Sequence, residues 1–252
     1  AVSIAAAVKG NADITIGNIV GSNILNILVI LGLAASIVPI AVARSTVRIE
    51  IPFMIGVTAL LFYQGRDGSI SLADGGVLMV AFAAYMMYLY TMAMKSNVDS
   101  DLEEPGLPLG RCLLGAVGGL ALIIAGSNVT VGAATSIATY AGLSERFIGL
   151  TIVALGTSLP ELFTSVAAAR RGNADIAIGN IVGSNIFNIL FVVGLSSLII
   201  DIPFASAFNF DTYVALGAAV LLWLCVLRTQ RLQRWAGALM LVCYAAYLGY
   251  IL

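Results

Sequence analysis

Long apolar stretches separated by short polar loops make up most of the chain, and runs of roughly 18 or more uncharged residues recur along it, the length that a helix needs to cross a bilayer. We therefore predict a partial helix over Ala1–Val8 and then eight membrane spans: Ile14–Ile40, Ile51–Tyr63, Gly75–Met94, Leu109–Asn128, Phe147–Ala169, Ile176–Ile200, Tyr213–Leu227 and Trp235–Leu252. Two stretches are ambiguous. Ile51–Tyr63 is short and could extend toward Val47, and Val129–Ala141 is either a helical continuation or an interfacial segment.

One sequence occurs twice in the chain. Lys9–Leu33 reads KGNADITIGNIVGSNILNILVILGL and Arg171–Leu195 reads RGNADIAIGNIVGSNIFNILFVVGL, with nineteen of 25 positions identical at an offset of 162. Solenoid and propeller repeats recur every 20 to 50 residues or so, so two distant copies indicate a chain built from two homologous halves. The polar linker KSNVDSDLEEPGLP separates the copies. It divides the chain into an N-terminal half (1–94), a linker (95–108) and a C-terminal half (109–252).

Composition places the chain in a membrane. It is 60% hydrophobic and 10% charged, with a mean hydropathy of +1.03, which is too apolar for a soluble domain. A net charge of −1 gives no basic surface for nucleic acid. The chain has no histidine, and it shows no nucleophile–base pair or histidine-containing metal motif, so we expect neither an enzyme nor a cofactor. The lipid bilayer is its predicted environment.

The basic residues indicate an orientation. Nine of the twelve fall on one predicted side of the membrane, namely Arg44, Arg48, Lys95, Arg111, Arg170, Arg171, Arg228, Arg231 and Arg234, and the other three are Lys9, Arg66 and Arg146. Since cytoplasmic loops are enriched in Lys and Arg, the linker is predicted to be cytoplasmic and the C-terminus outside, in the plasma (inner) membrane. Five predicted crossings separate the two copies, so they cross in opposite directions. Such inverted repeats are typical of secondary transporters, although channels also contain them.

One acidic residue differs from the others. Twelve of the 13 fall in loops or at span ends, whereas Glu161 lies inside an apolar span, in ALGTSLPELFTS. An intramembrane carboxylate is costly and marks a functional site by default. Pro160 and Gly156 disturb the helix there, so backbone carbonyls, two hydroxyls and a carboxylate come together. The alternative is a simple Gly/Pro kink, which is common in membrane helices.

The repeated segment supplies further oxygens. Asn18, Ser22 and Asn26 form one helical stripe, which the second copy repeats as Asn180, Ser184 and Asn188. Amide and hydroxyl oxygens suit hard cations such as Na+ and Ca2+. Alternatively these side chains could bond between helices, because the Gly-xxx-Gly pairs beside them are typical of close helix packing.

These motifs resemble the calcium/cation antiporter superfamily, most closely its Na+/Ca2+ exchanger branch. The resemblance rests on GTSLPE (Gly156–Glu161), GNIVGSNIFN (Gly179–Asn188) and GNIVGSNILN (Gly17–Asn26), and it extends over nearly the whole chain. It implies an all-α polytopic membrane protein with two inverted-topology repeats of about five helices each. The family's metal-coordinating positions match Glu161, Thr157, Ser158, the carbonyl of Ala154, Ser184, Asn188, Ser22 and Asn26.

The chain departs from this pattern at its beginning. At the offset of 162, the partner of GTSLPE falls before Ala1. We therefore expect the first repeat to be truncated, and a second GTSxPE-type glutamate to belong upstream. Asn188 stands where potassium-dependent relatives carry aspartate, which favours potassium-independent exchange.

The sequence thus predicts a secondary antiporter that exchanges Na+ for Ca2+ by alternating access, with both ions as transported partners. A proton/Ca2+ exchanger of the same fold and a passive cation channel are the alternatives.

Overall fold

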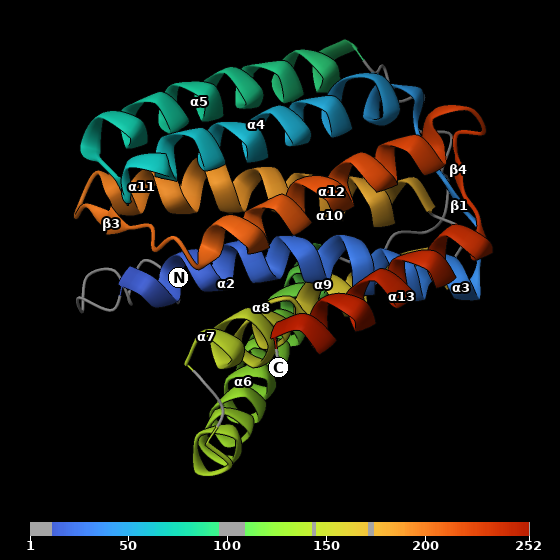
Figure 1. Ribbon diagram of the computed structural model, residues 1–252. Helices are drawn as coiled ribbons and strands as arrows, with labels where there is room; N and C mark the ends of the chain where they lie inside the picture. The colour runs from blue at the N-terminus through green and yellow to red at the C-terminus, as the bar shows by residue number, and fades with distance from the viewer. Residues whose placement is uncertain (1–11, 96–108, 143–144, 171–173, 252) are drawn as a thin grey trace.

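The computed structural model describes residues 12–95, 109–142, 145–170 and 174–251 (Figure 1). The predicted helix over 1–8 and most of the polar linker lie outside these ranges. The first half consists of α2 (Ala12–Leu25), the π-helical turn η1 (Asn26–Leu31), α3 (Gly32–Ile37), β1 (Ile40–Ala41), the π-helical turn η2 (Thr46–Glu50), α4 (Ile51–Gln64), the 3-10 turn η3 (Gly65–Asp67), β2 (Ser69–Ile70) and α5 (Leu72–Lys95).

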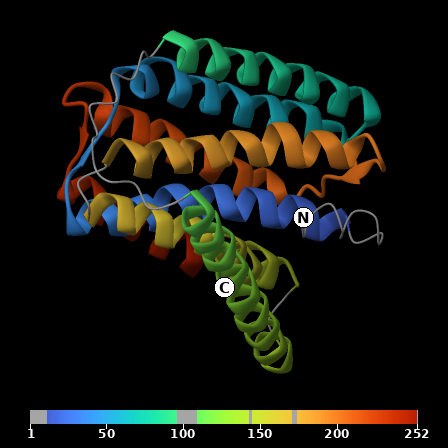
Figure 2. The ribbon, with the colours of Figure 1, turned by 180° about the vertical axis from the view of Figure 1, so that it is seen from behind.

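The second half contains helices α6–α9 before its copy of the repeated segment. Its elements are α6 (Leu109–Tyr140), α7 (Glu145–Ile148), the π-helical turn η4 (Gly149–Val153), α8 (Ala154–Thr157), α9 (Leu159–Arg170), α10 (Ala174–Phe187), the π-helical turn η5 (Asn188–Val193), α11 (Gly194–Ser197), β3 (Ile202–Pro203), α12 (Phe208–Leu227), β4 (Arg231–Leu232) and α13 (Arg234–Ile251). In Figures 1 and 2, α6 projects away from the other helices.

The two halves repeat one another element by element. α10, η5, β3, β4 and α13 begin 162 residues after α2, η1, β1, β2 and α5, respectively. Each short strand pairs with a strand of the other half: β1 is antiparallel to β4, and β2 to β3. The sequence repeat therefore corresponds to a structural repeat, and the two halves are joined at both ends of the helices.

The repeats run in opposite directions. In Figure 1, α2 runs from left to right toward α3, whereas α10 runs from right to left toward α11. α2 packs against α10 and α12. The predicted inverted topology is thus confirmed, and so is a predominantly helical fold, in which the four two-residue strands are the only sheet among the described residues.

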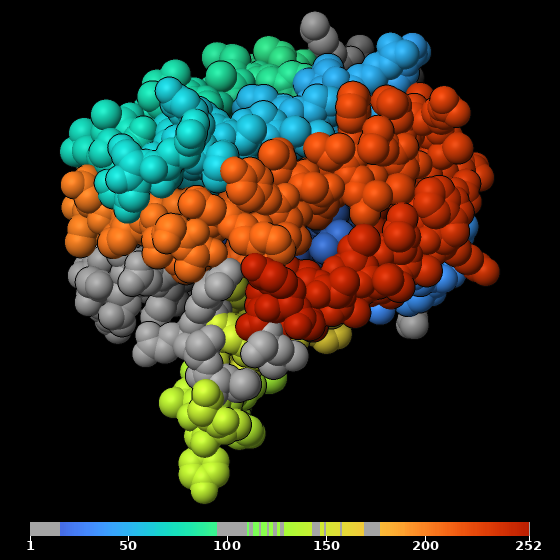
Figure 3. Space-filling view, viewed as in Figure 1, coloured from blue at the N-terminus to red at the C-terminus, as the bar shows by residue number. Residues whose placement is uncertain are grey.

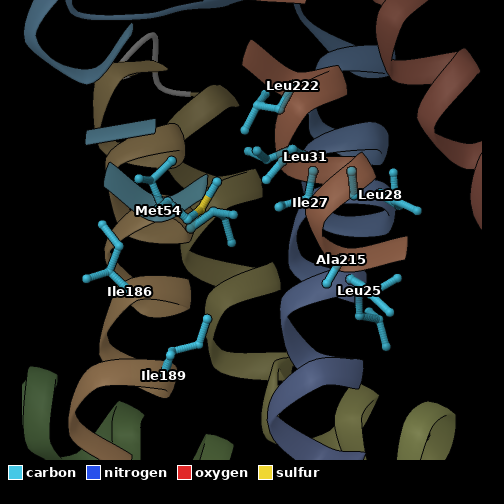
Figure 4. Close-up of a cluster of buried hydrophobic side chains, with 14 of the residues drawn as sticks. Leu25, Ile27, Leu28, Leu31, Met54, Ile186, Ile189, Ala215 and Leu222 are labelled. Carbon is cyan, nitrogen blue, oxygen red and sulfur yellow. The ribbon is translucent and has the colours of Figure 1, made fainter. Parts of the chain in front are cut away.

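The repeated helices occupy the centre of the structure. In an 18-residue window of the span Ile16–Ile37, 83% of the residues are buried, against 6% in the corresponding window of Leu72–Met94 in α5. In the space-filling view, α12 and α13 cover α2, which is visible only in a small area between them (Figure 3). Side chains from both halves meet in the apolar core (Figure 4), including Leu25, Ile27, Leu28, Leu31, Met54, Ile186, Ile189, Ala215 and Leu222.

Two symmetry-related glycines allow close helix contacts. A Cβ on Gly237 of α13 would lie 2.6 Å from the carbonyl oxygen of Gly32 in α3. A Cβ on Gly75 of α5 would lie 2.9 Å from the carbonyl oxygen of Gly194 in α11. Lipid tails provide little hydrophobic force between helices, so close approach at small residues stabilises the packing.

The spans differ in detail from the prediction. Among the described residues, six helices are long and apolar enough to cross a membrane, or seven if the bent pair Leu150–Gly156 and Leu159–Ala168 is one span. The helix of Ile51–Tyr63 extends back to Thr46, and Val129–Ala141 continues α6 as far as Tyr140. The predicted span Phe147–Ala169 is a broken helix that bends by 57° between Gly156 and Leu159, at the place where Gly156 and Pro160 were expected to disturb it.

Candidate ion-binding site

The break in this helix forms the centre of the candidate site. α8 ends at Thr157 and α9 begins at Leu159, with Ser158 between them at φ −97° and ψ 2°. The buried Ser158 donates its N–H to the carbonyl oxygens of Ala154 and Leu155, each at 3.1 Å. Pro160 is suited to the first turn of α9, where its missing N–H leaves no intrahelical bond unmade. Irregular backbone of this kind is tolerated at membrane depth where it faces protein or a cavity.

Glu161 lies in the first turn of α9. Its side chain is half-buried, and Oε2 is buried without a hydrogen-bond partner among the described residues. A buried carboxylate oxygen without a partner is unfavourable. Such an atom in a native structure is explained by a catalytic or strained role, or by a water or ion.

Two other buried acidic residues have partners. Thr46 Oγ1 donates to Glu50 Oε2 at 3.1 Å, and Tyr247 Oη donates to Asp211 Oδ1 at 2.9 Å. Both acids lie near the beginning of a span, consistent with the expectation that only Glu161 lies within one. Among the described residues, Glu161 is thus the carboxylate that has a buried oxygen without a hydrogen-bond partner.

The broken helix packs against the repeated helices of both halves. η4 and α8 contact α2, while α9 contacts η1 and α10. The approach to α2 is very close, because a Cβ on Gly21 would lie 2.7 Å from the Leu150 carbonyl oxygen. On the other side, Asn180 Nδ2 donates to Thr164 Oγ1 at 3.1 Å and joins α10 to α9. Asn180 therefore forms a hydrogen bond between helices, the alternative role that the sequence allowed for the residues of its stripe.

Four asparagines from the two copies form a symmetric hydrogen-bond cluster. Asn23 Nδ2 donates to the Asn185 carbonyl oxygen at 3.3 Å, and Asn185 Nδ2 donates to the Asn23 carbonyl oxygen at 3.2 Å. Asn26 Nδ2 donates to Asn185 Oδ1 at 2.8 Å, and Asn188 Nδ2 donates to Asn23 Oδ1 at 3.2 Å. The structure thus links the predicted residues Asn26 and Asn188 through a pair that the sequence analysis did not select.

One atom of this cluster remains unsatisfied. Asn26 is 1% exposed, and its Oδ1 is buried with no hydrogen-bond partner in the described part of the chain. Asn26 is the first residue of η1, which contacts α9, the helix that carries Glu161. π-helical turns occur frequently at functional sites, and here η1 and η5 begin at Asn26 and Asn188.

The remaining predicted residues lie on the same elements. Ser22 is buried in α2, and Ser184 is half-buried in α10. Ala154 is buried, and its carbonyl oxygen already accepts the Ser158 N–H. Thr157 is the last residue of α8, but its side chain lies outside what the structure describes.

The chemistry of these groups suits a hard cation. The site offers carbonyl, hydroxyl and amide oxygens with one carboxylate, and the described residues contain no group of three or more His, Cys, Asp or Glu that could hold a metal ion. Hard cations prefer such oxygen ligands, while softer metals favour sulfur and imidazole. The inverted repeats and the broken helix are typical of membrane transporters, whose substrate sites lie between two repeats.

Comparison with known proteins identifies the family. The family model described as sodium/calcium exchanger protein matches residues 1–91 and 112–252, and the chain belongs to that family. The CaxA protein of Alkalimonas amylolytica is 38% identical over 98% of this chain and 81% of its own length. The inner membrane protein YrbG of Escherichia coli (strain K12) is 40% identical over 79% of this chain and 64% of its own length.

A solved exchanger has the same fold. The sodium-calcium exchanger NCX_Mj, soaked with 2.5 mM Na+ and 1 mM Sr2+, has a TM-score of 0.81 at 31% identity, covering 98% of this chain and 80% of that one. The resemblance inferred from the repeated motifs is therefore confirmed at the level of family and fold.

Proposed function

We propose that this protein exchanges Na+ for Ca2+ across a membrane by alternating access between its two repeats. One observation carries the proposal: a buried carboxylate oxygen and a buried amide oxygen, on Glu161 and Asn26, both lack hydrogen-bond partners among the described residues, on elements that pack together. A cation between the repeats would satisfy both oxygens. The similarity to the sodium-calcium exchanger NCX_Mj, and to the sodium/calcium exchanger MaX1 of Methanosarcina acetivorans, which is 29% identical over 98% of this chain, supports this choice of ions.

Each proposed ligand has a distinct role. The Glu161 carboxylate supplies negative charge, and the amide oxygens of Asn26 and Asn188 supply neutral ligands. Ser22, Ser184, Ser158, Thr157 and the Ala154 carbonyl complete a set of eight residues, enough for the 6–8 oxygens that Ca2+ takes. An empty site leaves a carboxylate uncompensated in an apolar region, which disfavours the change between outward-open and inward-open states. The transport of one ion is therefore strictly coupled to the transport of the other.

The proposed orientation places the β1–β4 end of the protein in the cytoplasm. Five arginines lie in or beside these strands, namely Arg44, Arg48, Arg228, Arg231 and Arg234, whereas Arg66 lies near β2 at the opposite end. Cytoplasmic loops carry the excess of Lys and Arg. The similarity to YrbG, an inner membrane protein, supports a location in the plasma (inner) membrane.

The driving ion can be tested directly. In proteoliposomes that contain the complete protein, with any sequence that precedes Ala1, we expect Ca2+ uptake when Na+ is loaded inside and absent outside. A pH gradient in Na+-free buffer should drive no uptake, because in the proposed exchange the Na+ gradient supplies the energy.

The alternatives give different results in the same vesicles. Uptake driven by a pH gradient without Na+ would identify a proton/Ca2+ exchanger of this fold. Ca2+ flux that needs no counter-ion and far exceeds transporter turnover would identify a channel and contradict the proposal.

A further inference from the structure

The four-asparagine cluster suggests a role for the two residues that are not proposed ligands. We propose that Asn185 and Asn23 are positioning residues, which orient the amide groups of Asn26 and Asn188 so that oxygen rather than nitrogen faces the transported cation. This inference rests on the proposed function, because it concerns the same site. The evidence is which group donates and which accepts in each hydrogen bond of the cluster.

The first bond fixes the orientation of Asn185. Its Nδ2 donates to the backbone carbonyl oxygen of Asn23 at 3.2 Å. A carbonyl oxygen can only accept hydrogen bonds, so the group facing it must be NH2 and not the amide oxygen. The Asn185 side chain therefore directs Oδ1 the other way. A buried amide that is only 1% exposed has little freedom to adopt another arrangement.

The second bond fixes Asn26. Asn185 Oδ1 is an acceptor, so the nearest group of Asn26 must be the donor Nδ2, which lies 2.8 Å away. The amide oxygen of Asn26 is thereby turned away from Asn185. This oxygen is the buried atom without a partner. An unsatisfied buried Oδ1 is unfavourable, and a cation in the space before it would satisfy it.

The same reasoning applies in the second copy. Asn23 Nδ2 donates to the backbone carbonyl oxygen of Asn185 at 3.3 Å, and Asn23 Oδ1 accepts from Asn188 Nδ2 at 3.2 Å. The oxygen of Asn188 is then directed away from Asn23. Both orientations are thus anchored at a backbone carbonyl of the opposite repeat, and each repeat orients a ligand of the other.

The reverse orientation of a ligand would oppose cation binding. An amide has an oxygen at one end and an NH2 group with partial positive charge at the other. If Asn26 were free to turn, its NH2 would face the cation for part of the time. Ligand-orienting groups of this kind typically change metal affinity by about 10–100-fold when removed. We therefore expect Asn185→Leu to weaken Ca2+ binding by about 10–100-fold.

A compensating substitution separates orientation from general structural support. Aspartate has two equivalent oxygens, so a carboxylate at position 26 presents oxygen whichever way it turns. Asn26→Asp in the Asn185→Leu background should recover most of the lost affinity. Asn188→Asp in that background adds the same charge but leaves Asn26 unoriented, so it should recover little. The symmetric pair should behave in parallel, with Asn23→Leu rescued by Asn188→Asp and not by Asn26→Asp.

The measurement is equilibrium binding of radioactive calcium to the purified complete protein, with Na+-dependent uptake in proteoliposomes as a second readout. A parent protein that neither binds Ca2+ nor exchanges it would refute the proposed function itself. A parent that does both, with unchanged Ca2+ affinity in Asn185→Leu, would overturn only the orienting role. Equal rescue by Asn26→Asp and Asn188→Asp would also overturn it.

Folding needs its own check, because Asn185 is buried. Each variant is compared with the parent by gel filtration and thermal unfolding. If Asn185→Leu does not fold, the smaller, polar Asn185→Ser removes the amide oxygen with less disturbance, and the same rescue pattern is expected. Loss of folded protein in both variants would overturn the proposal, since Asn185 would then support the fold instead of one ligand.

Discussion

Replacing Glu161 with glutamine is expected to abolish Ca2+ uptake driven by a Na+ gradient. The substitution keeps the size of the side chain and removes its negative charge. Two unit charges 4 Å apart interact by about 4 kcal/mol at an effective dielectric constant of about 20, and a divalent ion at ligand distance interacts more strongly. Uptake at low Ca2+ concentration should therefore fall by at least about a hundredfold, because each loss of about 1.4 kcal/mol in binding free energy lowers the affinity about tenfold.

A matched control distinguishes a lost ligand from a general change of charge. Asp201 is exposed in the loop before β3, and Asp201→Asn removes the same charge outside the proposed site. This variant should exchange Ca2+ at the parent rate, and both variants should unfold at similar temperatures. Near-parent uptake by Glu161→Gln would remove Glu161 from the mechanism and leave its unpartnered Oε2 without an explanation.

The architecture could be predicted because the sequence itself contains the repeat. The described parts of the two copies, residues 12–33 and 174–195, are nearly identical in sequence and form the same succession of helices. The five predicted crossings between the copies, an odd number, then indicated that the copies cross in opposite directions. The break near GTSLPE was also predictable as a disturbance, because Pro160 removes a backbone donor. Its bend of 57° was not, since a bend depends on what packs on either side.

The asparagine cluster shows where sequence reasoning stopped. The helical stripe selected Asn18, Ser22 and Asn26 by spacing along one helix, and that argument does not include Asn23. The role of Asn23 depends on Asn185 in the other repeat, and only the packing of α2 on α10 brings them together. One signal was available: both copies contain the sequence GSN, so this asparagine is repeated as faithfully as the proposed ligands.

Gly21→Ala is expected to damage the protein far more than one methyl group suggests. A Cβ at this position would lie 2.7 Å from the Leu150 carbonyl oxygen, 2.9 Å from its Cα and 3.1 Å from the Ala154 Cβ. Two of these atoms are backbone, so no side-chain rotation relieves the contact and α2 must move away from η4 and α8. Overpacking of this kind costs about 1–3 kcal/mol. Because α8 leads into the break beside Ser158, we also expect exchange to fall by at least about tenfold, the factor that 1.4 kcal/mol represents.

The repeat supplies the control for this prediction. Gly183 is the equivalent residue in α10, and a Cβ there meets no described atom within 4 Å. In the 252-residue chain, thermal unfolding in detergent should therefore show a lower transition for Gly21→Ala and little change for Gly183→Ala. Similar transitions for the two variants would contradict the close packing at Gly21. In a longer protein, another segment could pack on α10 as η4 and α8 pack on α2. Gly183→Ala would then destabilise that longer protein. The pair of variants therefore also tests whether the two-fold symmetry is complete.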